Sequence, residues 1–318
     1  MKKMVGLGEI LWDVYPDERH LGGATANVAF HAANLGEEAI VVSRVGEDAP
    51  GAALIDILKS KRFYTGYIQR DPRKPTGCVK IHLDENGVPS FECGWDEAFD
   101  YLEWTGPLEN LAGSADAVFF GILAQRMPGS RATIQKFLDA APRALKVFDP
   151  NLRDFTEEIW PVLEASLQKA NLLKINEDEE KTLRSFYRKE ALSTEAFLGW
   201  LLMTFKLDAI YLTLGERGAF CCSKKGNVYA PGFRIHPVDT TGSGDAFMAA
   251  VVVEWLREVP LREILEFANA VGAYVATKEG AVPAYTRSEI LKFKHTRSEK
   301  NGDPDYYDLA GRTGRHWE

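Results

Sequence analysis

Short apolar runs alternate with longer amphipathic segments along this chain, and this alternation constrains its fold more than any other feature. The segments between most of the runs have a helical period, as in PGSRATIQKFLDAA from Pro128 and EEIWPVLEASLQKA from Glu157. Strand and helix in alternation predict an α/β fold, in which a mainly parallel sheet lies between layers of helices. Such sheets bind ligands beyond the carboxyl ends of their strands. The runs with the length and composition of buried strands are MVGLG from Met4, AIVVSRV from Ala39, AVFFG from Ala117, KVFD from Lys146, NLLKI from Asn171 and AIYLTL from Ala209.

Length and charge narrow the classes of function. The chain has 318 residues, is 45% hydrophobic and carries a formal net charge of -8. This suits one large domain with a sizeable core. Because the chain is acidic and has no run of Lys and Arg, it lacks the electrostatic footprint of a protein that binds nucleic acid or an anionic membrane. We therefore expect no nucleic-acid partner and no membrane association.

Cysteine usage and the N-terminal segment predict the compartment. None of the four cysteines forms a CxxC pair or a Cys/His array with the spacing of metal ligands: Cys78, Cys93, Cys221 and Cys222. We interpret them as buried thiols in a reducing cytosol. The opening MKKMVGLGEI lacks the apolar region of a signal peptide, and no apolar run is long enough to span a bilayer. The prediction is a cytoplasmic protein.

One segment interrupts the alternation. Between Thr76 and Phe91, GCVKIHLD and VPSFEC flank ENG, which predicts a β-hairpin with Asn86 and Gly87 at its turn. Such a hairpin could be a decoration at the edge of the sheet or a lid over a site at the end of the sheet. We expect residues 9 to 23 to contribute to the same lid.

The C-terminal third begins with a buried helix and ends without a pattern. AFMAAVVVEWLREV, which follows Asp245, is almost wholly apolar and predicts a central helix, and LREILEFANAVGAYVATKEG predicts another. From His295 the periodicity is lost and glycine and charge increase. We interpret this end as loosely packed or disordered and assign it no role.

The start of the apolar helix carries a candidate site. DTTGSGDAF, from Asp239 to Phe247, offers the backbone N–H groups of Gly242, Ser243 and Gly244 at a helix N-terminus, where anions bind. The stretch does not complete GxGxxG, and no Walker loop occurs in the chain. Asp245 could take a proton from an attacking hydroxyl while the N–H groups hold a phosphoryl group, or it could simply cap the helix.

DTTGSGDAF resembles the C-terminal signature of the ribokinase-like (PfkB) sugar kinase family, and further motifs in the order of that family extend the resemblance to roughly residues 4 to 294. The resemblance implies a three-layer α/β/α fold with a mainly parallel sheet and a small β-lid. It implies one kinase domain over residues 1–294, a lid formed by about 9–23 and 62–104, and an extension over 295–318. It also implies that Asp245 is the catalytic base and that the N–H groups form an anion hole.

Two motifs resemble the substrate side of the family. In GEILWDVYPDERHLGGATANVAFHAANLG, residues 8 to 36, the matching positions are Asp13, Gly22, Gly23 and Asn27. In FDPNLR, residues 148 to 153, they are Asn151 and Arg153. The resemblance implies contacts with sugar hydroxyls, whereas a plain turn, a helix cap and a surface ion pair are the alternatives.

Three motifs resemble the nucleotide side. NEDE implies that Asn176 approaches the ATP phosphates and that Glu179 positions Mg2+, in part through water. LTLGERGAF, from Leu212, implies a strand and turn along the phosphates, with Thr213, Gly215 and Gly218 as the matching positions. ANAVGAYVATKEGAVPA, residues 268 to 284, implies that Asn269 lies near the adenine.

The resemblance also implies a monovalent cation site. Its ligands would come from Asp239 and Thr241 and from carbonyl groups around Val275, Lys278 and Gly280. Position 284 is Ala, where several members of the family carry a hydroxyl residue. K+ is therefore an expected cofactor whose coordination departs from the pattern of the family.

Details of the motifs resemble the bacterial fructokinase branch: GEILWDVYPD, LGGATAN, FDPNLR and AFDYL. The acidic DEAFD contributes no lid arginine, which disfavours a sugar that carries a carboxylate or a phosphate. We expect ATP-dependent phosphorylation of D-fructose to fructose 6-phosphate. The alternatives are 2-keto-3-deoxygluconate kinase, with Arg153, Arg70, Arg73 or Lys74 as the cation for the carboxylate, then ribokinase, then a non-catalytic sugar or nucleotide sensor. An exposed lid edge predicts a lid-to-lid homodimer.

Overall fold

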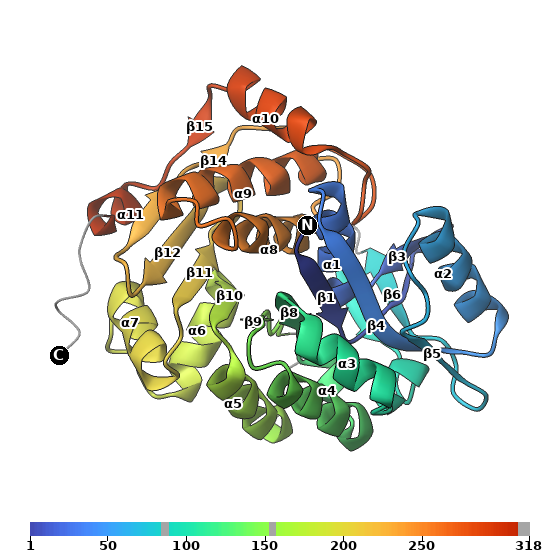
Figure 1. Ribbon diagram of the computed structural model, residues 1–318. Helices are drawn as coiled ribbons and strands as arrows, with labels where there is room; N and C mark the ends of the chain where they lie inside the picture. Colours follow the sequence, from blue (N-terminus) through green and yellow to red (C-terminus); the bar gives the residue numbers. More distant parts are fainter. Residues whose placement is uncertain (84–88, 153–156, 311–318) are drawn as a thin grey trace.

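A nine-stranded sheet runs through the centre of the molecule in the computed structural model, which describes residues 1–83, 89–152 and 157–310 (Figure 1). The strands from β11 to β5 are parallel, and β12 and β13 extend the sheet by antiparallel pairing. The order is β13 (Val228–Ala230), β12 (Ala219–Ser223), β11 (Ala209–Thr213), β10 (Leu172–Asn176), β9 (Leu145–Phe148), β8 (Ala117–Phe120), β1 (Lys3–Leu7), β4 (Glu38–Gly46) and β5 (Ile68–Asp71).

Helices cover both faces of this sheet, because successive residues of each strand point to opposite sides. Val5 packs into the core on the side of α3 to α7, and the preceding Met4 packs into the core on the side of α1, α8 and α9. One layer contains α1 (Ala24–Asn34), α8 (Ser243–Trp255), α9 (Leu261–Ala276) and α10 (Arg287–Thr296), with α2 (Ala49–Ser60) at its edge. The other contains α3 (Gly106–Ser114), α4 (Pro128–Ala140), α5 (Trp160–Lys169), α6 (Glu177–Phe186) and α7 (Thr194–Thr204).

The predicted strands and helices are confirmed. Each of the apolar runs forms a strand of the large sheet, and α4 and α5 occupy the two segments with a helical period. The apolar helix is α8, whose residues from Ala246 to Glu254 are all buried between α1 and α9. Short 3-10 helices join some elements: η1 (Ala98–Tyr101), η2 (Leu123–Gln125), η3 (Glu157–Ile159) and η4 (Gly215–Arg217).

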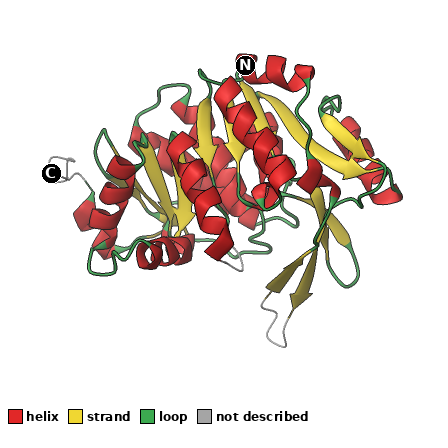
Figure 2. Ribbon diagram, turned by 90° about the horizontal axis from the view of Figure 1, so that it is seen from below, coloured by secondary structure: helices red, strands yellow, loops and turns green. Residues whose placement is uncertain are grey.

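A separate four-stranded sheet stands away from the main body (Figure 2). Its order is β3 (Arg19–Gly22), β2 (Leu11–Val14), β6 (Cys78–Leu83) and β7 (Pro89–Cys93). The antiparallel pairing of β6 with β7 confirms the predicted hairpin, while its turn, with Asn86 and Gly87, lies outside the described residues. The expected lid range 62–104 is too wide, because β5 within it pairs with β4 in the large sheet.

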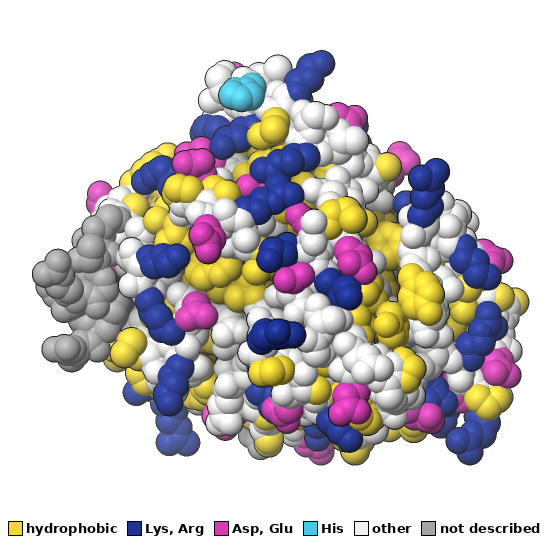
Figure 3. All heavy atoms as spheres, viewed as in Figure 1, with side chains coloured by type: hydrophobic (Ala, Val, Ile, Leu, Met, Phe, Trp, Pro, Cys, Tyr) yellow, Lys and Arg dark blue, Asp and Glu magenta, His cyan; other side chains and the backbone are white. Residues whose placement is uncertain are grey.

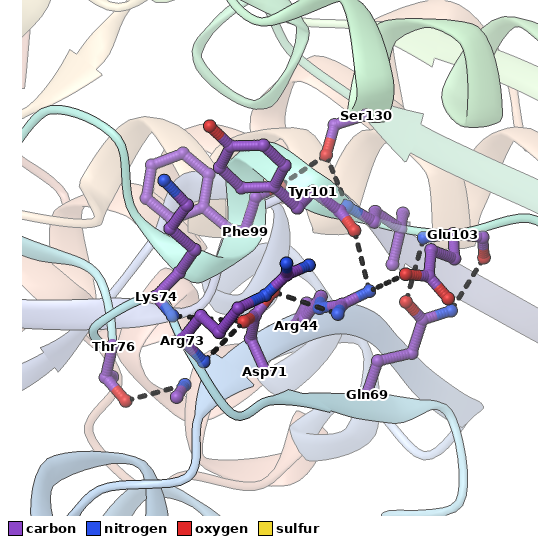
Figure 4. A network of polar contacts seen from close by, with 12 residues as sticks. Arg44, Gln69, Asp71, Arg73, Lys74, Thr76, Phe99, Tyr101, Glu103 and Ser130 are labelled. Atoms are coloured by element: carbon purple, nitrogen blue, oxygen red, sulfur yellow. Dashed lines mark hydrogen bonds and ion pairs between the residues drawn. The ribbon is translucent and has the colours of Figure 1, made fainter.

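A buried polar network joins this small sheet to the body (Figure 4). Arg44, at 7% exposure, pairs with Asp71 at 2.9 Å and with Glu103 at 2.8 Å, and it donates to the carbonyl of Tyr101 at 2.9 Å. Asp71 in turn accepts the N–H groups of Arg73 and Lys74. The segments that lead into and out of the hairpin are thus fastened to the ends of β4 and β5.

The C-terminal end is more ordered than predicted. β15 (Lys300–Asn301) pairs with β14 (Gly232–Phe233), and α11 (Pro304–Leu309) packs against β13. The expectation of a loosely packed or disordered end is therefore wrong for residues 300–309, because the apolar periodicity used to find packed segments misses an element this short. Residues 311–318 lie outside the described part of the chain.

The surface charge is mixed, and the cysteines form no disulfide. Basic and acidic side chains are interspersed over the face shown in Figure 3. None of the four cysteines is in a disulfide: Cys221 and Cys222 are buried, and Cys78 and Cys93 are half-buried. Over the described ranges, no helix has the length and apolar character needed to cross a bilayer.

Candidate active site

A cavity of about 850 Å³ opens between the carboxyl ends of the central strands and the small sheet. Gly121 and Asp149, which follow β8 and β9, line one side, and Val79 and Cys93 of the small sheet line another. The predicted residues that reach this cavity are Asp13, Gly23, Asn27, Asn151, Thr241, Gly242, Gly244 and Asp245. The topology thus brings the substrate motifs and the anion cradle to one place.

The start of α8 has the geometry of an anion cradle. Gly242 adopts φ 75°, and a Cβ there would lie 2.3 Å from the carbonyl oxygen of Ala281, so only glycine fits. The N–H groups of Gly244 and Asp245 belong to the first turn, which has no earlier helical carbonyl to bind. The N–H of Ser243 already donates to the carbonyl of Thr240 at 3.2 Å, so Ser243 contributes less than predicted.

Asp245 does not cap the helix. The N-cap is Gly242, and no side chain caps it. Instead, the Asp245 carboxylate accepts a hydrogen bond of 2.9 Å from the Nδ2 of Asn27 on α1. Burial, with the nearby charge of Asp149, raises the pKa of Asp245 to about 7, although Asn27 and Lys174 favour the charged form. A carboxylate with this pKa is suited to accept a proton near neutral pH.

Lys174 is a site residue that was not predicted from the sequence. It lies in β10 at 8% exposure, and its Nζ is 3.3 Å from the position that a Cβ on Gly244 would occupy. It pairs with Asp149 at 2.9 Å. Burial alone would lower the pKa of Lys174, but the carboxylates of Asp149 and Glu179 outweigh burial and raise it. The signal was present, since a lysine inside the apolar run NLLKI requires a partner.

Of the glycine pair on the sugar side, Gly23 lines the cavity and Gly22 precedes it in β3. A Cβ on Gly22 would lie 2.2 Å from the Oδ2 of Asp13, and one on Gly23 would lie 2.6 Å from the carbonyl oxygen of Glu9. Gly23 also has φ 104°. The Glu9 backbone and the positive φ therefore require glycine at position 23, whereas the close neighbour of Gly22 is the side chain of Asp13.

Two buried acceptors face this region without a partner. Among the described residues, the Oδ1 of Asn27 and the Oε2 of Glu9 make no hydrogen bond, although the two residues are 4% and 3% exposed. Burial raises the pKa of Glu9 to about 7. Unpartnered buried acceptors are costly, and hydroxyl groups of a bound polyol would satisfy them. Glu9 was not predicted, although a carboxylate directly after a buried strand run could have signalled it.

Two arginines line the cavity. Arg126 is held by the Asp100 carboxylate through two hydrogen bonds of 2.8 and 2.7 Å and lies 3.5 Å from Glu97. Arg131 donates instead to the carbonyl groups of Gln125 and Arg126. The acidic DEAFD segment thus neutralises one cation, while Arg131 has no carboxylate within ion-pair distance among the residues that the structure describes.

FDPNLR is only partly described. Asn151 lines the cavity, is exposed and adopts φ 45°, in the left-handed region. Arg153 lies outside the described residues. Its expected contact with substrate stays a prediction.

The predicted nucleotide residues lie at neighbouring strand ends, outside the cavity. Asn176 and Thr213 are direct partners in the parallel pairing of β10 with β11. The turn after β11 contains Gly215, with φ 58° and open space beside it, and Gly218, where a Cβ would lie 2.2 Å from the carbonyl oxygen of Ala230. Gly215 therefore leaves room for a ligand, and Gly218 permits close packing.

Asn269 has a structural partner. Its Nδ2 donates to the carbonyl groups of Ala230 at 2.9 Å and Pro231 at 3.2 Å. At 8% exposure it fastens α9 to the connection between β13 and β14. Proximity to adenine stays a prediction for this residue.

Glu179 has the chemistry of an indirect metal partner. Its Oε1 accepts the N–H of Leu152 at 2.8 Å, and its Oε2 accepts the N–H of Asn176 at 2.7 Å, in a capping box at the start of α6. Burial raises its pKa, and Lys174 opposes this. Because both oxygens are engaged and the residue is 4% exposed, the fit is to a Mg2+ reached through water. Within the described ranges, no group of three or more His, Cys, Asp or Glu could hold a metal.

The expected monovalent cation residues lie together. Asp239 accepts the N–H of Thr241 at 2.9 Å and that of Gly280 at 3.1 Å. Lys278 is exposed, and its N–H donates to the carbonyl of Val275 at 2.9 Å. Two loops are thus joined around one carboxylate, an arrangement that fits a cation of low charge coordinated mainly by carbonyl groups.

Comparisons with known proteins also indicate a sugar kinase. The profile of the pfkB family carbohydrate kinase matches residues 14–287. The uncharacterized sugar kinase PH1459 of Pyrococcus horikoshii is 33% identical over 295 residues, which cover 90% of each chain. Fructokinase-2 of Zea mays is 30% identical over 310 residues, 88% of this chain and 90% of its own.

Solved structures agree in fold. PH1459 in complex with ATP has a TM-score of 0.78 at 30% identity, covering 93% of this chain and 99% of its own. The fructokinase of Vibrio cholerae with fructose, ADP and calcium ion has a TM-score of 0.76 at 25% identity, covering 92% and 99%. The predicted ribokinase-like three-layer fold is thereby confirmed.

Proposed function

Since this chain belongs to the pfkB family of carbohydrate kinases, we propose that its substrate is D-fructose, which it phosphorylates at a primary hydroxyl to give fructose 6-phosphate. The chain is an ATP-dependent sugar kinase. One observation carries the assignment of its chemistry: the Asp245 carboxylate lies at the start of α8, next to unpaired N–H groups, and is held by Asn27.

The reaction is a direct transfer. Asp245 takes the proton of the attacking hydroxyl, the new P–O bond forms to the sugar oxygen, and the bond between the γ-phosphorus and the oxygen of ADP breaks. The N–H groups of Gly242 and Gly244 donate to the phosphoryl oxygens, and Lys174 places a positive charge beside Gly244. Asp149 holds the lysine in place from the other side.

The expected cofactors have residues that suit them. Mg2+ carried by the phosphates of ATP would be held through water by Glu179 and Asp149, and it would neutralise phosphate charge. K+ would lie at the loops around Asp239 and Gly280, where it would steady the start of α8. The remaining steps depend on groups of this chain, which bind the sugar and exclude water.

The cavity supports a neutral polyol. Asp13, Asn27 and Glu9 present acceptor oxygens toward hydroxyl groups. The charge of Arg126 is already satisfied by Asp100 and Glu97, so this arginine does not call for an anionic substrate. The names of relatives point in the same direction, since the maize relative is a fructokinase and the Vibrio cholerae structure holds fructose.

A second substrate has one observation in its favour. Arg131 lines the cavity, and among the described residues no carboxylate pairs with it. A guanidinium in that position would suit the carboxylate of 2-keto-3-deoxygluconate. Ribose is a third candidate, with no specific contact that favours it.

A coupled ADP-release assay separates these candidates. Fructose, 2-keto-3-deoxygluconate, ribose, tagatose and fructose phosphates are compared with Mg-ATP, and the product is identified by 31P NMR. We expect the highest kcat/KM for fructose, and Arg131→Gln should leave it nearly unchanged. Activity with 2-keto-3-deoxygluconate alone, lost in Arg131→Gln, would replace the fructose assignment. If none of these sugars releases ADP, the fructose assignment is wrong and neither alternative substrate replaces it.

The small sheet is proposed to act as the lid. It contributes Asp13, Val79 and Cys93 to the cavity wall, and closure would exclude water as a competing acceptor. Its outer strands β3 and β7 each pair with one neighbour among the described strands, so a lid-to-lid homodimer is part of the proposal. Light scattering after size exclusion measures the mass, and a monomer at all concentrations would remove this part.

A further inference from the structure

The C-terminal extension returns to the nucleotide side of the sheet. Residues 300–309, here called the extension segment, comprise β15 and α11. β15 pairs with β14, and the N–H of Asp303 donates to the hydroxyl of Tyr229 at 2.7 Å. Tyr306 and Tyr307 pack against Tyr229, with ring centroids 5.9 and 4.8 Å apart. The segment is therefore packed against the sheet edge next to the predicted ATP site.

Arg217 connects this segment with both parts of that site. It lies in the turn of residues 214–218, between Gly215 and Gly218. Its Nη2 lies 2.5 Å from the Oε2 of Glu177, the first residue of α6, and its Nη1 pairs with the carboxylate of Asp303. Glu177 directly follows Asn176, so one guanidinium links the turn, the start of α6 and the extension segment.

Contacts with β13 and β14 also hold the turn of residues 214–218 in place. The Tyr229 hydroxyl donates to the carbonyl of Arg217 at 2.6 Å. A Cβ on Gly232 of β14 would lie 2.0 Å from the carbonyl oxygen of Glu216, so backbone touches backbone here. Because the extension segment pairs with β14 and β14 contacts the turn directly, a shift of the segment would also displace the turn.

We propose that the extension segment positions the ATP-binding turn through the chain of contacts Asp303–Arg217–Glu177. The guanidinium sets the distance between the turn that carries Gly215 and the helix start that carries Asn176, and Asp303 holds the guanidinium in place. This inference rests on the proposed nucleotide site. Arg217 and Asp303 act through the turn, and they are positioning residues.

The variant Asp303→Asn tests the inference in the full-length chain. Asp303 is also the N-cap of α11, where its Oδ1 accepts the N–H of Asp305 at 3.1 Å, and asparagine preserves such a cap. The variant thus removes the negative charge that pairs with Arg217 and keeps the N-cap of α11. We expect the Kd for ATP, measured by calorimetry, to rise about fivefold, as for a modest coupling between two sites. The KM for the sugar and kcat at saturating ATP should stay unchanged.

Two further variants make the test specific. Asp305→Asn is the matched control, because Asp305 is exposed and forms no ion pair among the described residues. It should leave the Kd for ATP unchanged. Arg217→Gln should raise the Kd, and the double variant Arg217→Gln with Asp303→Asn should raise it no further, because both changes break one link.

Thr213→Val separates the inference from the proposed site. If Thr213→Val and Asp303→Asn both weaken ATP binding, the inference is supported. If Thr213→Val weakens binding and Asp303→Asn lowers only the melting temperature, the extension merely stabilises the fold and the inference is wrong. If neither variant changes the Kd, the proposed nucleotide site and the inference both fail.

Discussion

The side-chain amide of Asn27 donates a hydrogen bond of 2.9 Å to the carboxylate of Asp245, across 218 positions of the chain. The contact joins the buried start of α1, on the sugar side, to the start of α8, on the phosphoryl side. Because the amide stabilises the charged carboxylate, it opposes the burial that raises the pKa of Asp245. One contact therefore links sugar recognition to the protonation of the proposed base.

Asp245→Asn tests the proposed base. Asparagine keeps the shape of the side chain but cannot accept the hydroxyl proton, so kcat should fall by roughly 10²- to 10⁴-fold. The Kd for the sugar, measured by calorimetry, should change little. Asp56→Asn, which changes an exposed side chain of α2, is the control and should keep full activity. Near-normal turnover by Asp245→Asn would refute the proposed mechanism.

Removal of Asn27 should shift the pH dependence. In Asn27→Ala the charged form of Asp245 loses a hydrogen bond, so the pKa rises above about 7 and the acid limb of the kcat–pH profile moves to higher pH. The control is Asn34→Ala in the same helix, whose amide donates to the carbonyl of Pro283. An unchanged limb in Asn27→Ala would show that Asp245 does not control the profile.

Lys174→Met should slow phosphoryl transfer. The methionine keeps most of the volume but removes the charge beside Gly244, so kcat should fall by about 10²-fold. The acid limb should also move to higher pH, because Lys174 favours the charged form of Asp245. Lys169→Met, which removes a lysine paired with Asp139 at the end of α5, is the control. If both variants retain full kcat, Lys174 serves the fold only.

Stability should depend on pH through Asp245. Its pKa is raised from 3.8 to about 7, so the folded protein keeps a proton that the unfolded chain releases in this window. Stability from this group is thus present at the acid end and lost as pH rises toward 7 and above. The pKa of His31 is lowered to about 4, so the stability that His31 contributes is lost as pH falls below its usual value of 6.5. Because the two groups change stability in opposite directions, only the difference between a variant and the wild type reports on Asp245.

That difference is between Asp245→Asn and the wild type. At pH 5 the folded wild type still carries a neutral Asp245, but the unfolded chain has already released this proton, so the variant should melt at a slightly higher temperature than the wild type. At pH 8 Asp245 is charged in the folded wild type as well, and the variant should exceed the wild type by a larger margin. Equal differences at both values of pH would contradict the raised pKa.

The network of Figure 4 should stabilise the fold strongly at one contact and weakly at another. Arg44→Met leaves the Asp71 carboxylate, whose side chain is 3% exposed, without its cation, which should cost roughly 3 to 5 kcal/mol in the free energy of unfolding. Glu103→Gln is the matched variant, because the Glu103 side chain is 70% exposed and should contribute less than about 1 kcal/mol. Urea unfolding measures both. Equal losses would show that burial does not control these pairs.

Much of the fold followed from the sequence alone. The strands β1, β4, β8, β9, β10 and β11 were predicted from apolar runs, and α8 from its unbroken apolar pattern. Gly242 and Gly244 predicted a helix N-terminus open to an anion, and the structure has one there. Such features are local, because the period of a strand or helix and the backbone freedom of glycine are properties of neighbouring residues.

Other features depended on contacts between distant segments. The charge of Arg126 is neutralised by Asp100, Lys174 points to the start of α8, and Asp303 reaches Arg217, yet none of these pairs is close in sequence. Periodicity finds the strands but not which side chains meet across their ends. The sequence by itself determined the layers and the phosphoryl cradle. Only the tertiary structure decided which charges meet, because burial and charge pairing depend on distances that strand order and helix packing set.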